Sequence, residues 1–128
     1  MEYNFERDRP LRGMRILIAD DEFLIAITIE EAFRDAGADV VTAATLGAAL
    51  KSVRADEALS AAFLDVRLGH DTTEAVADEL AARAVPFAFY TGQALPDHIR
   101  RKHPDIKVLI KPSKQELFIA TILDIARH

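Results

Sequence analysis

Residues 15–22 read Arg-Ile-Leu-Ile-Ala-Asp-Asp-Glu, and they join a short apolar run directly to three acidic side chains. The apolar part, Ile16–Ala19, has the length and composition of a strand that is buried on both faces. Similar runs recur along the chain, and they predict four further strands at Val40–Ala43, Ala61–Leu64, Pro86–Tyr90 and Ile106–Ile110. A series of fully apolar strands is typical of a parallel sheet that is covered on both sides.

Segments with helical spacing separate these runs, and they predict helices at Phe23–Ala36, Leu46–Val53, Glu74–Ala84, Pro96–Lys102 and Lys114–Arg127. Thr45 is placed to cap the start of the second helix, and Gly37 is placed to end the first. Strict alternation of strands and helices predicts an α/β fold, a doubly wound parallel sheet. With five strands, the flavodoxin-like order 2-1-3-4-5 is the expected arrangement.

The composition of the 128-residue chain, 50% hydrophobic and 29% charged, fits one ordinary globular domain. The absence of cysteine excludes disulfides, thiolate catalysis and cysteine-ligated metal sites. The formal net charge of −5 disfavours a generally basic surface that binds nucleic acid. Because residues 1–13 are polar and lack periodicity, we expect them to be a flexible N-terminal leader, with the folded domain at 14–128.

Several other classes of protein find no support in the sequence. No apolar run approaches the roughly 18 residues of a membrane span, and the polar N-terminus does not resemble a signal peptide. We therefore expect a cytoplasmic protein with no membrane contact and no room for a second, effector domain. The four histidines lack the spacing of a zinc site, and the chain has no glycine-rich nucleotide-binding motif.

Polar side chains follow four of the predicted strands at the point where each strand ends. In chain order they are Asp20-Asp21-Glu22, Asp65, Thr91-Gly92 and Lys111-Pro112. The carboxyl ends of parallel strands meet at one edge of the sheet, so we expect these side chains to converge there. Each of them also has an ordinary explanation when taken alone. Aspartates cap helices or form turns, threonines cap helices, and a lysine at a strand end can pair at the surface.

The residue types at this edge suit phosphoryl transfer. Asp20, Asp21 and Asp65 would repel one another without a counter-ion, and Mg²⁺ prefers oxygen ligands from carboxylates, waters and phosphate. Lys111 would supply a point charge for a phosphoryl oxygen and Thr91 a hydroxyl donor. Carboxylates are known nucleophiles that form aspartyl-phosphates, and a metal and a cation are what such a transfer requires.

With these motifs, the chain from about Met14 onward resembles the CheY-like receiver domains of response regulators in bacterial two-component signalling. The resemblance implies that Asp65 is the phosphoacceptor and that Thr91 and Lys111 contact the phosphoryl group. It implies that Mg²⁺ is held by Asp20, Asp21, Asp65 and the backbone carbonyl of Arg67. It also implies a cis bond between Lys111 and Pro112, and a histidine kinase or a histidine phosphotransfer protein as the phosphoryl donor.

Residues 86–92, Pro-Phe-Ala-Phe-Tyr-Thr-Gly, more narrowly resemble the FAT GUY subgroup, which includes many stand-alone receivers. Tyr90 replaces the alanine of that motif. Val108 stands where the wider family has its switch aromatic, and Gly69 stands where it usually has a proline. We expect Tyr90 to pack half-buried with its hydroxyl at the surface. The basic run at residues 100–103 is interpreted as either a solvated surface or a docking surface.

These observations predict a single-domain response regulator of a phosphorelay, whose only chemistry is self-catalysed phosphotransfer and dephosphorylation, and not an ordinary enzyme. Its signal would leave by binding another protein, or the protein would act as a phosphate sink. One alternative is an aspartyl-phosphate phosphatase of the haloacid dehalogenase type, which needs a second aspartate where this chain has Arg67. Another is a pseudo-receiver that is never phosphorylated, which the presence of Asp65, Thr91 and Lys111 argues against.

Overall fold

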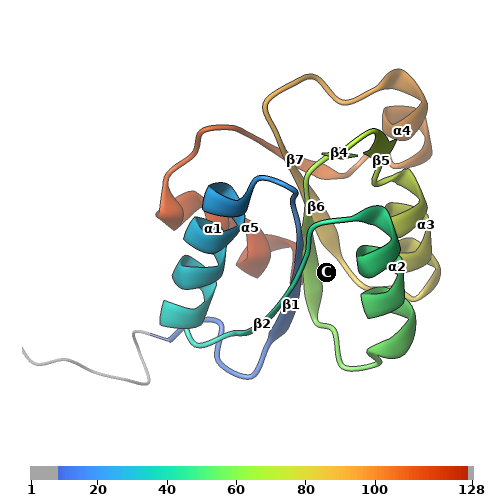
Figure 1. Ribbon diagram of the computed structural model, residues 1–128. Coiled ribbons are helices and arrows are strands. Elements are labelled where there is room, and N and C mark those ends of the chain that lie inside the picture. The colour runs from blue at the N-terminus through green and yellow to red at the C-terminus, as the bar shows by residue number, and fades with distance from the viewer. Residues whose placement is uncertain (1–8, 127–128) are drawn as a thin grey trace, which may run out of the picture.

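The computed structural model describes residues 9–126, and its main sheet has five parallel strands in the order β2-β1-β3-β6-β7 (Figure 1). The strands are β1 (Arg15–Ala19), β2 (Asp39–Ala43), β3 (Ala61–Leu64), β6 (Phe87–Thr91) and β7 (Lys107–Ile110). Counted along the chain within this sheet, the order is 2-1-3-4-5. The predicted doubly wound, flavodoxin-like fold is therefore confirmed.

The helices of the described residues are α1 (Phe23–Asp35), α2 (Leu46–Ala55), α3 (Glu74–Ala82), α4 (Asp97–Lys102) and α5 (Gln115–Ala126). Helices α1 and α5 cover one face of the sheet, and α2, α3 and α4 cover the other (Figure 1). The Thr45 hydroxyl accepts the Ala48 N–H at 3.1 Å, as predicted for a cap. Helix α3 ends before its predicted limit, since Ala84 has a φ of 57°. Among residues 9–126, no helix is long and apolar enough to cross a membrane.

Side chains of a strand alternate between the two faces of the sheet, so neighbouring residues of β6 enter different cores. Phe87 and Phe89 pack in the core beneath α2, α3 and α4. Ala88 and Tyr90 face α1 and α5. The core on that second side contains a group of touching aromatic rings, formed by Phe33, Phe63, Tyr90 and Phe118.

A two-stranded hairpin, absent from the predicted elements, lies directly after β3. Strand β4 (Arg67–Leu68) pairs antiparallel with β5 (Asp71–Thr72), and Gly69 in the turn has a φ of +63°. The Thr73 hydroxyl donates to the Asp65 carbonyl at 2.6 Å, which ties the end of the hairpin back to the end of β3. The hairpin therefore holds the segment after Asp65 close to the carboxyl edge of the sheet.

Residues 9–13 belong to the predicted leader, but the structure packs them on the domain. Leu11 is fully buried in the core beneath α1 and α5, and its N–H donates to the Ala36 carbonyl at 2.8 Å. Gly37 has a φ of +101°, and a Cβ there would lie 3.0 Å from the Arg9 Cβ. Residues 9–13 thus pack against the end of α1, because burying Leu11 outweighs the polar character of its neighbours. The rest of the predicted leader, residues 1–8, lies outside the described residues.

Candidate functional site

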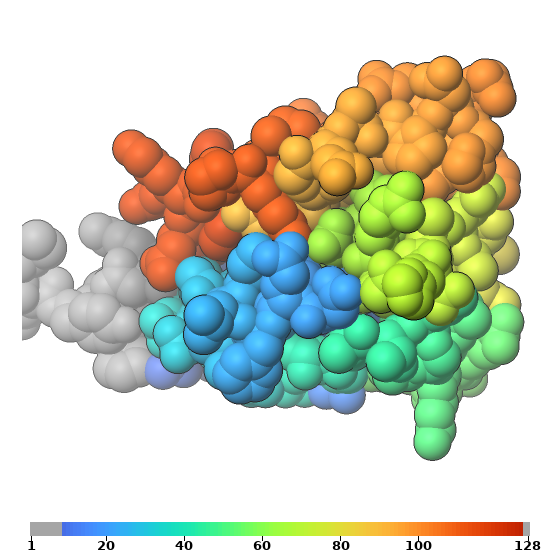
Figure 2. Space-filling model, turned by 45° about the horizontal axis from the view of Figure 1, so that its top comes forward, coloured from blue at the N-terminus to red at the C-terminus, as the bar shows by residue number. Residues whose placement is uncertain are grey.

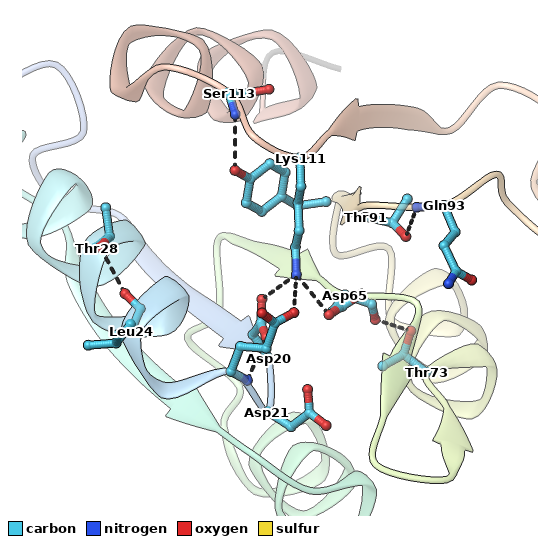
Figure 3. Close-up of polar contacts among 12 residues, drawn as sticks. Asp20, Asp21, Leu24, Thr28, Asp65, Thr73, Thr91, Gln93, Lys111 and Ser113 are labelled. Atoms are coloured by element: carbon cyan, nitrogen blue, oxygen red, sulfur yellow. Dashed lines mark hydrogen bonds and ion pairs between the residues drawn. The ribbon is translucent and has the colours of Figure 1, made fainter.

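Lys111 stands at the centre of a group of carboxylates at the carboxyl edge of the sheet (Figure 3). Its Nζ lies 2.9 Å from Asp65 Oδ2, 3.1 Å from Asp20 Oδ2 and 3.2 Å from Glu22 Oε1. The structure thus brings Asp20, Asp65 and Lys111 together, as the strand order predicts. Their chemical roles stay predictions.

The backbone of the sheet places each of these residues. The Asp20 N–H donates to the Ala43 carbonyl at 3.1 Å, and the Asp65 N–H donates to the Ala19 carbonyl at 2.8 Å. The Lys111 N–H likewise donates to the Thr91 carbonyl at 2.9 Å. Each of these three residues therefore continues the hydrogen-bond ladder one position past its strand, which fixes where its side chain starts.

The charges of the group are held by opposing effects. Burial raises the pKa of Asp20. The Glu22 N–H at 2.9 Å and the Lys111 ammonium lower it, but burial outweighs them, so the pKa of Asp20 is raised. Burial lowers the pKa of Lys111, but the hydrogen bond to Asp65 and the charge of Asp20 outweigh burial, so the pKa of Lys111 is raised. Lys111 is therefore an ammonium throughout the physiological pH range, and it stands beside the Asp65 carboxylate.

A cavity of about 310 Å³ opens beside this group, and the residues lining it include Asp21, Asp65, Arg67, Thr91, Gln93 and Lys111. Figure 2 looks onto this edge, where the start of α1 (blue), the hairpin of β4 and β5 (yellow-green) and the segment after β6 (gold) meet. The Thr91 side chain is buried, and its hydroxyl accepts the Gln93 N–H at 3.2 Å. Thr91, at the end of β6, thus lines the same cavity as Asp21, which follows β1.

The acidic side chains form an all-oxygen donor set. One carboxylate oxygen from each of Asp20, Asp21, Glu22 and Asp65 lies within 4.8 Å of the others. Asp21 is exposed, and its Oδ2 accepts the Gly69 N–H of the hairpin turn at 2.7 Å. Hard oxygen ligands that are partly open to solvent suit Mg²⁺, which keeps several waters when it binds. The residues present therefore fit the predicted magnesium site.

Tyr90 differs from its predicted environment. It is 5% exposed rather than half-buried, and its hydroxyl accepts the Ser113 N–H at 3.2 Å (Figure 3, dashed line at Ser113). Ser113 follows the cis bond between Lys111 and Pro112, which the structure contains as expected. A hydrogen-bond donor on the next segment helps the residue to be buried, because a buried tyrosine hydroxyl needs a partner.

Part of the basic run on α4 pairs with acids on α3. Lys102 Nζ lies 2.6 Å from Glu74 Oε2 and 3.0 Å from Asp78 Oδ2. His103 Nε2 lies 3.2 Å from Asp78 Oδ1, and its ring packs edge-on against Phe87. Lys102 and His103 therefore hold α4 against α3, whereas Arg100 and Arg101 remain exposed.

Two residues of the site were missed by sequence reasoning. Glu22 was noted only as part of the acidic run, yet its carboxylate shares Lys111 with Asp20 and Asp65. Thr73 lies directly before the predicted helix that begins at Glu74, and its buried hydroxyl donates to the carbonyl of Asp65. The acidic run itself could have signalled Glu22. No sequence signal marks Thr73, because its contact depends on the path of the hairpin.

No family model matches the chain, and no curated protein sequence matches it. Solved structures, in contrast, do match the chain. A response regulator receiver protein from Sinorhizobium medicae has a TM-score of 0.82 and 22% identity, with 91% of this chain and 97% of that chain covered. A receiver domain protein (CheY-like) from Methanospirillum hungatei has a TM-score of 0.80 and 20% identity, covering 89% of this chain and 94% of that one.

A third structure is a receiver domain of a sensor histidine kinase from Pseudomonas aeruginosa, with a magnesium ion coordinated in its active site cleft. Its TM-score is 0.77 and its identity 23%, with 91% of this chain and 99% of that chain covered. At such identities the likeness lies in the arrangement of strands and helices rather than in the sequence. The chain has the fold of CheY-like response regulator receiver domains.

Proposed function

We propose that this protein is a response regulator of a two-component phosphorelay, which receives a phosphoryl group on Asp65 from a histidine kinase or a histidine phosphotransfer protein. The observation that carries the proposal is the Lys111 ammonium, 2.9 Å from Asp65 and 3.1 Å from Asp20 beside an open cavity. A cation so placed attracts an anionic donor and stabilises the charge of the group being transferred.

The reaction follows from the donor and acceptor groups. A carboxylate oxygen of Asp65 attacks the phosphorus of a phosphohistidine, an O–P bond forms, and the N–P bond breaks. The bonding electron pair goes to the imidazole nitrogen, and because the other ring nitrogen of the phosphohistidine carries a proton in the reacting form, the donor histidine leaves as a neutral ring. Lys111 and the Thr91 hydroxyl would hold phosphoryl oxygens, and water would later hydrolyse the acyl phosphate.

A magnesium ion belongs to this proposal. Asp20, Asp21 and Asp65, with the backbone carbonyl of Arg67, would hold it, and the donor set fits its preference for oxygen. When bound, Mg²⁺ would neutralise negative charge on the transferring group. The haloacid dehalogenase alternative is weaker, because Arg67, a lining residue of the cavity, stands where that class needs a carboxylic acid.

The signal would leave by contact with another protein, or the chain would act as a sink for phosphoryl groups. In either case we place it in the cytoplasm, where phosphorelay donors act. The FAT GUY resemblance stays a prediction within this proposal.

The test is phosphorylation by phosphoramidate in the presence of Mg²⁺, followed by intact mass measurement. We expect the mass of one phosphoryl group to be added to the native protein and to Asp71→Asn, a matched change in the exposed strand β5. Asp65→Asn should stay unmodified, because its amide is not a nucleophile. Equal modification of Asp65→Asn would remove Asp65 as the acceptor, and no modification of any variant would reject the proposed function.

A further inference from the structure

Tyr90 contacts both the functional lysine and the segment that carries it. The Lys111 Nζ lies over the Tyr90 ring, 5.4 Å from its centroid. The Tyr90 hydroxyl accepts the Ser113 N–H, two residues after Lys111, at 3.2 Å. The Tyr90 side chain of β6 therefore contacts the segment just after β7 twice, at the ammonium of Lys111 and at the backbone N–H of Ser113.

The ring supports the position of the ammonium. A lysine is attracted to the face of an aromatic ring, and the attraction is strongest where water is displaced. The Lys111 side chain is only 11% exposed, so the ring and the carboxylates of Asp20 and Asp65 together leave it little room to move. The Tyr90 ring thus limits a flexible four-carbon chain to the place from which it reaches Asp65.

The ring itself is held by its neighbours. It stacks on Phe63 with centroids 5.4 Å apart and planes at 26°, and it meets the ring of Phe118 on α5 at 5.1 Å and 69°. Phe118 lies one turn into α5, and Ser113 lies just before that helix. A shift of Lys111 that displaces the Tyr90 ring would therefore also displace Ser113 and Phe118 at the start of α5.

Val108, which stands where the resembled family has its switch aromatic, packs on the opposite face of the sheet from Tyr90. It pairs with Phe89 and packs against the core beneath α2, α3 and α4. Tyr90 pairs with Leu109 and belongs to the core beneath α1 and α5. The aromatic contact that joins the site to a helix in this chain is therefore the one between Tyr90 and Phe118, and that helix is α5.

We infer that Tyr90 is a positioning residue for Lys111 and that it links the phosphoryl site to the start of α5. The inference rests on the proposed function, since Lys111 is taken to act on a phosphoryl group. Tyr90 touches no reacting atom. Its ring sets where the ammonium lies, and its hydroxyl transmits the position of that ammonium to Ser113.

Two substitutions separate the ring from the hydroxyl. Tyr90→Leu removes both, so we expect the rate of phosphorylation by phosphoramidate to fall about threefold to tenfold. Tyr90→Phe keeps the ring, and it should restore most of the rate that Tyr90→Leu loses. The control is Phe33→Leu, which shrinks a ring of the same aromatic group that is in contact with Phe63. This control should lower the thermal unfolding midpoint and leave the rate within about twofold.

The link to α5 has its own readout. Binding of beryllofluoride with Mg²⁺ should shift the Ser113 amide resonance in the native protein, and this shift should be greatly reduced in Tyr90→Phe. The Lys111 side-chain methylene resonances of the unmodified protein should change in Tyr90→Leu and stay close to native in Tyr90→Phe, because the ring current is lost only in the former.

The outcomes separate the two proposals. If Tyr90→Leu reacts at the native rate, or if Phe33→Leu slows the reaction as much as Tyr90→Leu does, the positioning role is rejected. An unchanged Ser113 shift in Tyr90→Phe rejects the link to α5. If the native protein accepts no phosphoryl group, the proposed function fails. The Lys111 resonances then still decide whether Tyr90 sets the place of the ammonium.

Discussion

The hydroxyl of Thr91 accepts the Gln93 N–H, and this bond fixes the first turn of the segment that leads from β6 to α4. The same hydroxyl still has its own hydrogen to donate, and a phosphoryl group on Asp65 would offer an oxygen to accept it. Movement of Thr91 toward that oxygen would pull on the Gln93 N–H, which would couple the binding of an anion to the path of the loop. Thr91 and Tyr90 are neighbours on β6, yet they would send their effects to opposite sides of the sheet.

For Thr91→Ala we expect phosphorylation of Asp65 to persist at a rate about threefold to tenfold lower, because one donor to the phosphoryl group is lost. Thr91→Ser keeps the hydroxyl and should stay close to the native rate. Beryllofluoride-induced amide shifts at residues 93–102 should be smaller in the alanine variant than in the serine variant. Equal shifts in the two variants would show that the hydroxyl does not move the loop.

Three glycines among residues 9–126 have a positive φ, and two of them, Gly37 and Gly69, differ in what surrounds them. Gly69 has a φ of +63°, and a Cβ there would meet nothing within 4 Å. Gly37 has a φ of +101°, and a Cβ would lie 3.0 Å from Arg9 and 3.2 Å from the backbone of Arg12. An alanine would have a strained backbone at both positions. Only at Gly37 would its Cβ also push the packed segment at residues 9–13 away from α1.

We therefore expect Gly69→Ala to lower the free energy of unfolding by about 1–2 kcal/mol, the cost of a left-handed alanine. Gly37→Ala should cost more than Gly69→Ala, because it also displaces the segment that buries Leu11. Urea unfolding of the two variants measures the difference. A larger loss for Gly69→Ala would mean that Leu11 contributes little to stability.

The contact between α3 and α4 depends on charge. Hydrogen bonding to Lys102 lowers the pKa of Glu74. Burial raises the pKa of Asp78, but hydrogen bonds from Lys102 and His103 outweigh it, so that pKa is also lowered. His98 Nε2 adds a contact of 3.0 Å to Glu74. A lowered carboxyl pKa contributes stability above the ordinary pKa of the group, and this contribution is lost as pH falls through the folded-state value.

We expect the contact to be intact above the ordinary pKa values of Glu74 and Asp78, 4.5 and 3.8, and to weaken as pH falls below them. Amide hydrogen exchange of residues 97–102 should speed up over that range relative to β3, after correction for the intrinsic pH effect. Lys102→Met should reduce this pH dependence. Because these pairs are exposed, 1 M salt should reduce it as well. Identical pH profiles for the native and Lys102→Met proteins would contradict the charge dependence.

At the scale of the whole molecule, the five apolar runs were sufficient to predict the sheet and its order, and the strand ends predicted which side chains meet. The contacts that escaped prediction depend on turns. The bond from Thr73 to Asp65 requires the hairpin of β4 and β5, and burial of Leu11 requires the reversal at Gly37. The bond between Tyr90 and Ser113 requires the path after Lys111. Hydrophobic periodicity carries no information about such paths.

The proposed magnesium site makes a prediction about global stability, since a ligand that binds only the folded state stabilises it. Mg²⁺ at roughly tenfold its Kd should raise the thermal unfolding midpoint by about 4–7 °C. Asp21→Asn should lose most of this rise, whereas Asp35→Asn, an exposed change at the end of α1, should keep it. A rise of the same size in Asp21→Asn would place the ion elsewhere.

The bond from the Gly69 N–H to Asp21 gives the molecule a spectroscopic label of its own. Glycine amide nitrogens resonate apart from those of other residues, and the chain has only 5 glycines, so this signal is easily resolved. A cation that binds the Asp21 carboxylate would change the electron density of the oxygen that accepts the Gly69 N–H at 2.7 Å, and so would shift the Gly69 amide signal. Ion entry can thus be followed at one peak in the nitrogen-15-labelled protein of native sequence, without a fluorophore or an engineered cysteine.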